Sequence, residues 1–356
     1  MKNSTTMPNG LRSPVASRRP RFDTGLKVLR HLLVAAIGIH AGVAFAAAPV
    51  NPFANAECIA PAKSGGGFDV SCKLVQVMFN EAKILPQAMR TSYLLGGIGA
   101  VAFHTFVTKR PADSHALVAF SGGSLLNLAQ GKFGPYSEDD VRWVAAIGMD
   151  YGVVAVRKNS PFQTLKDLVV ALRANPNSVI FGAGGTIGSQ DWIKSAKISR
   201  AAGVDFKLMR FVAFEGGGEA FSALDGGHVQ VVAGDAAEVT QQIAAGADIR
   251  VLAVLSSKRL PGMLASVPTA AEQGYDIRWP IVRGFYVGPK VSDADYNAWV
   301  DAFSRVMAMP AYGAQLAQAG LFPQPMVGAE LTSFVKRSMF DYRELAAEFK
   351  LPVSKR

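Results

Sequence analysis

The stretch of residues 57–79 restricts the fold more than any other part of the chain, because it combines three local patterns in a fixed order. Apolar residues 58–60 predict a strand, and the glycines at 65–67 interrupt regular structure and let the backbone approach a ligand closely. Asp69 then predicts the N-cap of a helix with apolar residues at helical spacing. A helix start presents unpaired N–H groups and partial positive charge, so this loop is either an anion site or a tight turn without a ligand.

The order of strand, glycine turn and helix occurs again further along the chain. Residues 116–120 predict a strand that ends at Gly122 and Gly123, flanked by Ser121 and Ser124. Repeated units of this kind favour an α/β fold with mainly parallel sheets, in which ligands lie at the carboxyl ends of the strands. The two serines are therefore candidate ligand contacts, with helix capping as the alternative role for each.

A third unit of this kind follows the apolar residues 179–181. Its glycines have the spacing Gly-x-Gly-x-x-x-Gly, whereas dinucleotide-binding loops have Gly-x-Gly-x-x-Gly, and no acidic ribose partner stands out near the end of the next strand. We therefore expect no nicotinamide cofactor and no other cofactor. The loop remains a second helix start with free N–H groups, to which Thr186 and Ser189 add hydroxyl groups.

Residues 1–46 have the features of a secretory signal peptide. A basic start is followed by an apolar run at residues 32–48, and Ala44-Phe45-Ala46 fits the small-residue rule for cleavage after Ala46. The alternative is a membrane anchor, but the run is short and contains His40. We expect an exported protein.

Removal of this segment changes the charge of the protein. The full chain has 37 basic and 27 acidic residues, and the part after residue 46 has 30 and 26. This small excess gives no support to nucleic-acid binding. About 310 residues remain, which exceeds one ordinary hydrophobic core and predicts two domains.

Cys58 and Cys72 are the only cysteines of the chain. An even number of cysteines in an exported protein favours a disulfide, and two buried thiols are the alternative. The bridge would tie the first strand to the first turn of the following helix and close the glycine loop from behind.

Catalytic patterns are missing from the exported part of the sequence. Its three histidines, His104, His115 and His228, have no metal-ligand spacing, and we expect no metal site. Neither a Gly-x-Ser-x-Gly elbow nor a Ser-x-x-Lys motif at the start of a glycine-turn helix occurs. We therefore expect a binding protein and not an exported hydrolase or another enzyme.

Several of these motifs resemble the substrate-binding proteins of tripartite tricarboxylate transporters. Their first loop usually reads Pro-Gly-Gly-Gly-x-Asp, and here Ser64 stands in the place of the proline. Residues 57–61 with Cys72, and the sequence Gly-Ser-Gln-Asp-Trp at 188–192, are similar to the tricarboxylate-binding branch of that family. Residues 267–274 are close to the most recognisable downstream pattern of the family, so the resemblance covers essentially the whole chain after the signal segment.

The resemblance implies a two-domain periplasmic-binding-protein fold of the clamshell type II, with crossover strands between mainly parallel sheets. Domain 1 would comprise residues 47–150 and 287–356, and domain 2 residues 151–286. The function implied is that of a monomeric periplasmic receptor, which captures a citrate-like tricarboxylate in the cleft and delivers it to membrane permease subunits. The alternative is a sensory receptor that presents another di- or tricarboxylate to a sensor kinase.

The expected ligand site combines the glycine-rich helix starts of both domains with nearby hydroxyl and charged groups. Arg283 lies on the expected return strand and could pair with a ligand carboxylate, although a cation there needs a partner or exposure. Asp69 is itself negative, so its expected roles are helix capping and the positioning of a bridging water. The full set is Gly65, Gly66, Gly67, Phe68, Asp69, Ser121, Ser124, Gly185, Thr186, Ile187, Gly188, Ser189, Asp235 and Arg283.

Overall fold

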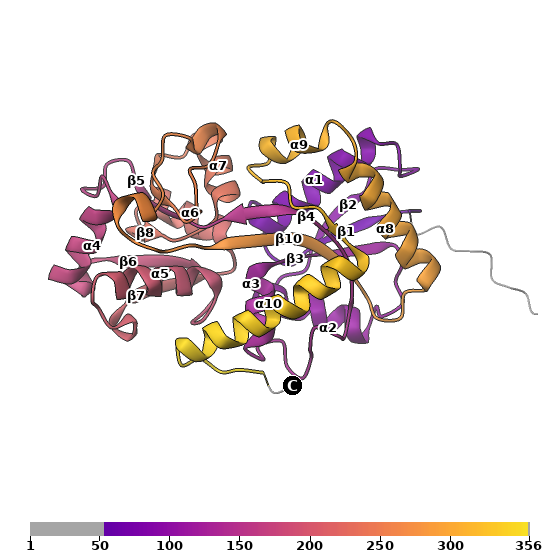
Figure 1. The fold of residues 1–356 in the computed structure, drawn as a ribbon, viewed down its shortest axis with the longest axis horizontal. Helices are drawn as coiled ribbons and strands as arrows, with labels where there is room; N and C mark the ends of the chain where they lie inside the picture. Colours follow the sequence, from indigo (N-terminus) through magenta and orange to yellow (C-terminus); the bar gives the residue numbers. More distant parts are fainter. Residues whose placement is uncertain (1–52, 355–356) are drawn as a thin grey trace, which may run out of the picture. The chain divides into compact units, whose positions relative to one another are not determined.

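The computed structural model describes residues 53–354, all of which belong to one compact unit. The predicted signal peptide and its cleavage after Ala46 lie outside the described residues. The described chain forms two β-sheets, each with helices of its own (Figure 1). We call each sheet with its helices a lobe.

The first lobe contains a six-stranded sheet with the strand order β11-β4-β10-β3-β1-β2. β1 pairs in parallel with β2 and β3, whereas β10 is antiparallel to β3 and β4. The strands are β1 (Glu57–Ala60), β2 (Arg90–Tyr93), β3 (Ala116–Ser121), β4 (Arg142–Tyr151), β10 (Pro280–Val287) and β11 (Met326–Val327). The main helices of this lobe are α1 (Gly67–Glu81), α2 (Ala100–Thr108), α3 (Gly122–Ala129), α8 (Asp293–Met307), α9 (Tyr312–Gln318) and α10 (Gly328–Glu348).

The second lobe contains a five-stranded sheet with the order β7-β6-β8-β5-β9. β6 is parallel to β7 and β8, and β5 is antiparallel to β8 and β9. The strands are β5 (Val153–Arg157), β6 (Ile180–Gly184), β7 (Arg210–Phe214), β8 (Val231–Val232) and β9 (Ile249–Val254). Its main helices are α4 (Leu165–Ala174), α5 (Gln190–Ala201), α6 (Gly217–Asp225) and α7 (Ala236–Ala244).

The chain passes between the sheets twice. β4 of the first sheet leads through Gly152 directly into β5 of the second, and residues 255–279 connect β9 back to β10. Because β10 pairs with β3 and β4, residues 280–286 lie in the first sheet, although the expected division assigns them to domain 2. The exact domain division stays a prediction.

The expected α/β class is confirmed, but both sheets are mixed and not mainly parallel. Strands that belong to βα units, such as β1 and β6, pair in parallel with their neighbours. The strands β10 and β5, by which the chain enters each sheet from the other lobe, are antiparallel to theirs. The helix start at Asp69 is also different from the prediction, because α1 begins at Gly67 with Gly66 as its N-cap. Gly66 has extended backbone angles, and Asp69 lies in the first turn of the helix.

Cys58 and Cys72 form the predicted disulfide, and both are fully buried. They lie in the core of the first lobe, where α1 packs against β1. The bridge therefore fixes the start of α1 to the strand that precedes the glycine loop.

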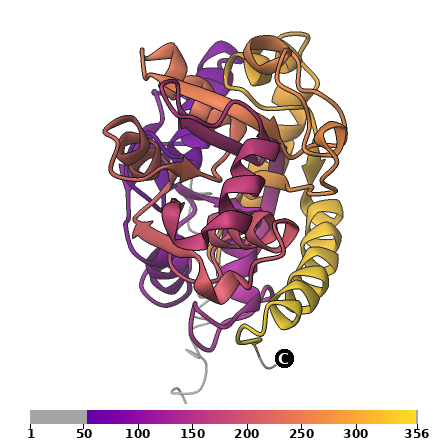
Figure 2. The same ribbon diagram turned by 90° about the vertical axis from the view of Figure 1, so that its left-hand side faces the viewer.

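α10 lies beside β4 and β10 and extends from the first lobe to the second (Figure 1, Figure 2). It packs along α3 and β4, and Phe349, directly after its last turn, lies in the core of the second lobe. The ring of Phe349 is 5.2 Å from the ring of Phe206 and 6.3 Å from that of Trp192. Trp192 is therefore a core residue.

Candidate functional site

Five helix starts from the two lobes meet around one small cavity. The starts of α1 and α3 come from the first lobe, and those of α5, α6 and α7 come from the second. The volume of the cavity is about 30 Å³. It is lined by Ala62, Gly66, Gly67, Phe68, Ile98, Ser121, Gly123, Asn127, Gly184, Ser189, Gln190, Asp191, Gly216, Gly217, Asp235, Glu238 and Arg283.

Half of the residues predicted for the site line this cavity. They are Gly66, Gly67, Phe68, Ser121, Ser189, Asp235 and Arg283. Ser121 and Ser189 are N-caps of α3 and α5, since their hydroxyl oxygens accept hydrogen bonds from the backbone of Ser124 and Trp192. Ser121 and Ser189 can therefore cap their helices and also line the cavity, because the helix starts form part of the cavity wall.

The second predicted loop lies at the outer edge of the site. Gly185 and Thr186 line a wider hollow of about 540 Å³, next to the cavity, and Thr186 is exposed. The carbonyl oxygens of Ile187 and Gly188 accept hydrogen bonds from Lys132 at 2.6 Å and Gln130 at 2.7 Å. This loop of the second lobe is therefore held by the segment after α3 of the first.

Gly65, Asp69 and Ser124 do not line the cavity. The Asp69 carboxylate accepts hydrogen bonds from the Gly65 backbone at 2.8 Å and the Tyr93 hydroxyl at 2.7 Å, and it pairs with Lys73 at 2.7 Å. Burial opposes its charge, but the bonds from Lys73 and Gly65 lower its pKa. Asp69 therefore stabilises the glycine loop from within the first lobe. The Ser124 hydroxyl donates to the carbonyl of Ser121.

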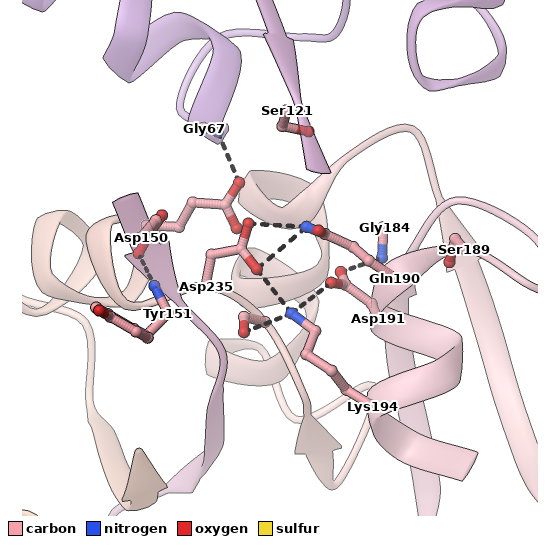
Figure 3. Close-up of polar contacts among 12 residues, drawn as sticks. Gly67, Ser121, Asp150, Tyr151, Gly184, Ser189, Gln190, Asp191, Lys194 and Asp235 are labelled. Carbon is pink, nitrogen blue, oxygen red and sulfur yellow. Dashed lines mark hydrogen bonds and ion pairs between the residues drawn. The ribbon is translucent and has the colours of Figure 1, made fainter. Parts of the chain in front are cut away.

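A buried ionic cluster that the sequence did not predict forms part of the cavity wall. Arg283 pairs through one nitrogen, Nη2, with Asp150 at 2.6 Å and with Asp235 at 2.7 Å. Lys194 pairs with Asp191 at 2.8 Å and with Asp235 at 2.7 Å, as Figure 3 shows. Asp235 is thus shared by both cations and joins β10 of the first sheet to α5 of the second lobe.

These pairs determine the charges in the cluster. Burial favours the neutral form of Arg283, but the carboxylates of Asp150 and Asp235 raise its pKa above the usual range. Burial also favours the neutral form of Asp235, but the charges of Lys194 and Arg283 lower its pKa. Arg283 is therefore a charged residue at the cavity that already has carboxylate partners from the protein.

Glu238 of α7 is a further group that the sequence analysis missed. Its Oε1 accepts a hydrogen bond from the backbone nitrogen of Gly67 at 2.6 Å, so a side chain of the second lobe contacts the start of α1. Burial raises the pKa of Glu238 well above the usual range, and the charge of Asp235 acts in the same direction. The available signal was the pair Asp235 and Glu238, which are three residues apart at a helix start and so share one face.

Other contacts between the lobes surround the cavity. Lys63 and Glu219 form a salt bridge between the lobes, and Glu219 lines the outer hollow. A Cβ atom added to Gly218 would lie 2.9 Å from the carbonyl carbon of Gly65, so the backbones of α6 and the glycine loop are in close contact. The structure therefore shows the two lobes closed on each other. Within residues 53–354, no group of histidine, cysteine and carboxylate residues is arranged to hold a metal ion.

Comparison with known proteins places this arrangement in a family. Residues 97–348, more than half of the chain, match the model of the tripartite tricarboxylate transporter family receptor. The chain belongs to this receptor family. A protein of Cupriavidus necator called "UPF0065 protein in gbd 5'region" is 26% identical over 86% of this chain and 90% of its own. This match identifies the family but does not distinguish its branches, so the tricarboxylate branch stays a prediction from the sequence.

Solved structures support the same fold. The periplasmic binding protein BugD is 19% identical, with a TM-score of 0.72, and the match covers 83% of this chain and 98% of BugD. Rpa4515 of R. palustris, solved with adipate, is 18% identical with a TM-score of 0.74, over 85% and 99% of the two chains. The predicted periplasmic-binding-protein fold is therefore confirmed. In the described part of the chain, no helix has both the length and the apolar character needed to cross a membrane.

Proposed function

We propose that this receptor works in the periplasm, where it closes its lobes around a small di- or tricarboxylic acid, such as citrate, and delivers the acid to permease subunits. The observation that carries the proposal is the meeting of helix starts from both lobes at one cavity. Helix starts provide N–H groups and partial positive charge to an anion, and they do so without further cations. The membership of the receptor family supports the role in transport.

The contacts between the lobes support a capture mechanism in which the lobes move. The cavity is small, at about 30 Å³, and residues of both lobes line it. Polar contacts between the lobes help to close it, among them Lys63 with Glu219, Lys132 with Ile187 and Gly67 with Glu238. A ligand would enter while the lobes are apart and would then replace part of these contacts.

A thermal-shift panel tests the proposal. The purified protein without residues 1–46 is heated with citrate, malate or adipate, and with glucose as an uncharged control of similar size. A ligand at a hundred times its Kd stabilises the folded protein by about 2.7 kcal/mol. We expect a clear rise in Tm with at least one acid and none with glucose. Equal Tm values with all four compounds would contradict a carboxylate receptor.

A further inference from the structure

Glu238 has one carboxyl oxygen without a protein partner. The side chain is 5% exposed and lines the cavity. Its Oε1 takes the hydrogen bond from Gly67, and no hydrogen bond or ion pair of Oε2 occurs among residues 53–354. A Cβ atom added to Gly217 would lie 1.9 Å from Oε2, so this oxygen is held against the start of α6. Oε2 is not fully buried, because it keeps some accessible surface where Glu238 lines the cavity.

The groups around Glu238 contain more acids than bases. Arg283 on β10 pairs with Asp150 on β4 and with Asp235, which precedes α7. Lys194 on α5 pairs with Asp191 and again with Asp235. Both buried cations are therefore paired with other carboxylates, and Glu238 has no ion pair of its own.

A charged Glu238 would thus be an unpaired buried carboxylate beside Asp235, and both burial and the like charge disfavour this state. The neutral acid avoids this penalty, and its proton has a natural position on Oε2, because Oε1 is the acceptor for Gly67. The raised pKa of Glu238 agrees with this assignment. In this state, Oε2 carries an O–H donor that lines the cavity.

We propose that Glu238 contacts the ligand as a neutral carboxylic acid and donates a hydrogen bond from Oε2 to a ligand carboxylate. The inference rests on the proposed function, since it assumes that a carboxylic acid binds in this cavity. A second donor is available nearby, because Nε of the buried Arg283 has no hydrogen-bond partner among the described residues. The ligand carboxylate would then satisfy two protein groups that are unsatisfied in the closed lobes.

This arrangement makes binding dependent on a proton. When Glu238 loses its proton, it loses the donor and places a negative charge beside the ligand carboxylate and Asp235. Affinity should therefore fall as pH rises above the pKa of Glu238, by up to tenfold for each pH unit. The alternative is that Glu238 only competes with the ligand for the Gly67 N–H.

Calorimetry with malate and with adipate distinguishes these roles. Both acids are ionised from about pH 6 to about pH 9, since ordinary carboxyl pKa values lie near 4. The proteins are the wild type, Glu238→Gln, Glu238→Ala and the control Glu344→Gln, which makes the same chemical change at an exposed position on α10. Lys132, whose pKa burial lowers to about 8, is retained in all four, so its titration affects them equally.

We expect wild type and Glu344→Gln to lose affinity as pH rises across this range. Glu238→Gln keeps an N–H donor and cannot ionise, so it should bind with an affinity that varies little with pH. Glu238→Ala should bind about tenfold or more weakly than wild type at the lower pH, because a hydrogen bond to a charged acceptor is lost.

Equal pH dependence in wild type and Glu238→Gln would overturn the inference while leaving the receptor function intact. Tighter binding by Glu238→Ala would also overturn it and would identify Glu238 as a competitor. If neither acid nor citrate bound to the wild type at any pH, the proposed function and this inference would both fail. Should Glu238→Ala not fold, the comparison of Glu238→Gln with wild type decides alone.

Discussion

The carboxyl group of Glu238 lies 2.6 Å from the backbone nitrogen of Gly67, although 171 residues separate the two in the sequence. The N–H group that the glycine loop was expected to offer to a ligand is therefore bonded to the protein itself. The bond joins α7 of the second lobe to α1 of the first. We therefore expect the protonation state of Glu238 to affect the stability of the protein, the closure of the lobes and the binding of the ligand.

The stability of the protein should depend on pH through Glu238. Its pKa is raised in the folded protein, so the folded state binds the proton more tightly than the unfolded state, and wild type loses stability as pH rises from the usual glutamate pKa to the raised one. Each pH unit in this interval costs about 1.4 kcal/mol. Glu238→Gln should therefore be more stable than wild type in urea at about pH 8 but not at about pH 4. A constant difference at both pH values would contradict this.

Arg283 should be necessary for the stability of the buried ionic cluster. Arg283→Met leaves Asp150 and Asp235 without this partner, and removal of one partner of a buried pair costs about 3–5 kcal/mol. Urea denaturation should show this loss, and a second change, Asp150→Asn, should recover part of it. The control Lys158→Met breaks an exposed pair with Asp248 and should change stability by less than about 1 kcal/mol. Similar losses in both variants would refute the assignment.

The disulfide should stabilise the first lobe. A closed loop of about 15 residues contributes about 3 kcal/mol in the chain-entropy model, so Cys58→Ala with Cys72→Ala should lower the unfolding free energy by about that amount. The measurement is denaturant unfolding of the double variant beside the wild type. Intact-mass analysis after alkylation without reductant should show no labelled thiol in the wild type, and two labelled thiols would rule the bridge out.

Closure of the lobes can be blocked at Gly218. A Cβ atom there would lie 2.9 Å from the carbonyl carbon of Gly65 in the other lobe, and the three nearest atoms all belong to that lobe. Gly218→Ala should therefore prevent the decrease in radius of gyration that we expect on ligand binding, and should weaken binding. Gly313→Ala, where an added Cβ meets nothing within 4 Å, is the control. Solution scattering with and without ligand measures the effect, and normal closure of Gly218→Ala would show that the lobes close differently.

Ser189 and Thr186 should differ in their effect on ligand binding. Ser189 lines the cavity, whereas Thr186 is exposed beside the outer hollow. Ser189→Ala should weaken binding by about tenfold or more, because its hydroxyl can donate to a charged acceptor, and it should also lose about 1 kcal/mol of stability with its helix cap. Thr186→Val should have the smaller effect in calorimetry. The opposite order would place the ligand in the outer hollow.

The parts of the site that were predictable from the sequence are local in the chain. The glycine loops, the capping serines and the disulfide each depend on residues within one βα unit, so their pattern can be read directly. Even there, three successive glycines leave the position of the helix start open, so the sequence predicts Asp69 as the N-cap, whereas the structure has Gly66 there. The direction of a strand also has no local signal, which is why the antiparallel pairing of β10 was not expected.

The ion pairs of Arg283 could not be predicted because their partners are distant in sequence. Arg283 is 133 residues from Asp150 and 48 from Asp235. A buried charge is stable only if its partners are present, and these partners are determined by the packing of both lobes. The sequence therefore identified Arg283 as a cation in need of a partner but could not name Asp150.

The position of Phe349 limits how the lobes can separate. The lobes are attached to each other at three points. Two are the chain connections, from β4 to β5 and through residues 255–279. The third is the ring of Phe349, which follows α10 and packs in the core of the second lobe. Two attachments alone would leave the lobes free to twist as well as to swing. Phe349 adds a third point of contact beside α10, so we expect the lobes to separate mainly by a swing about an axis near that helix, with little twist of one lobe against the other.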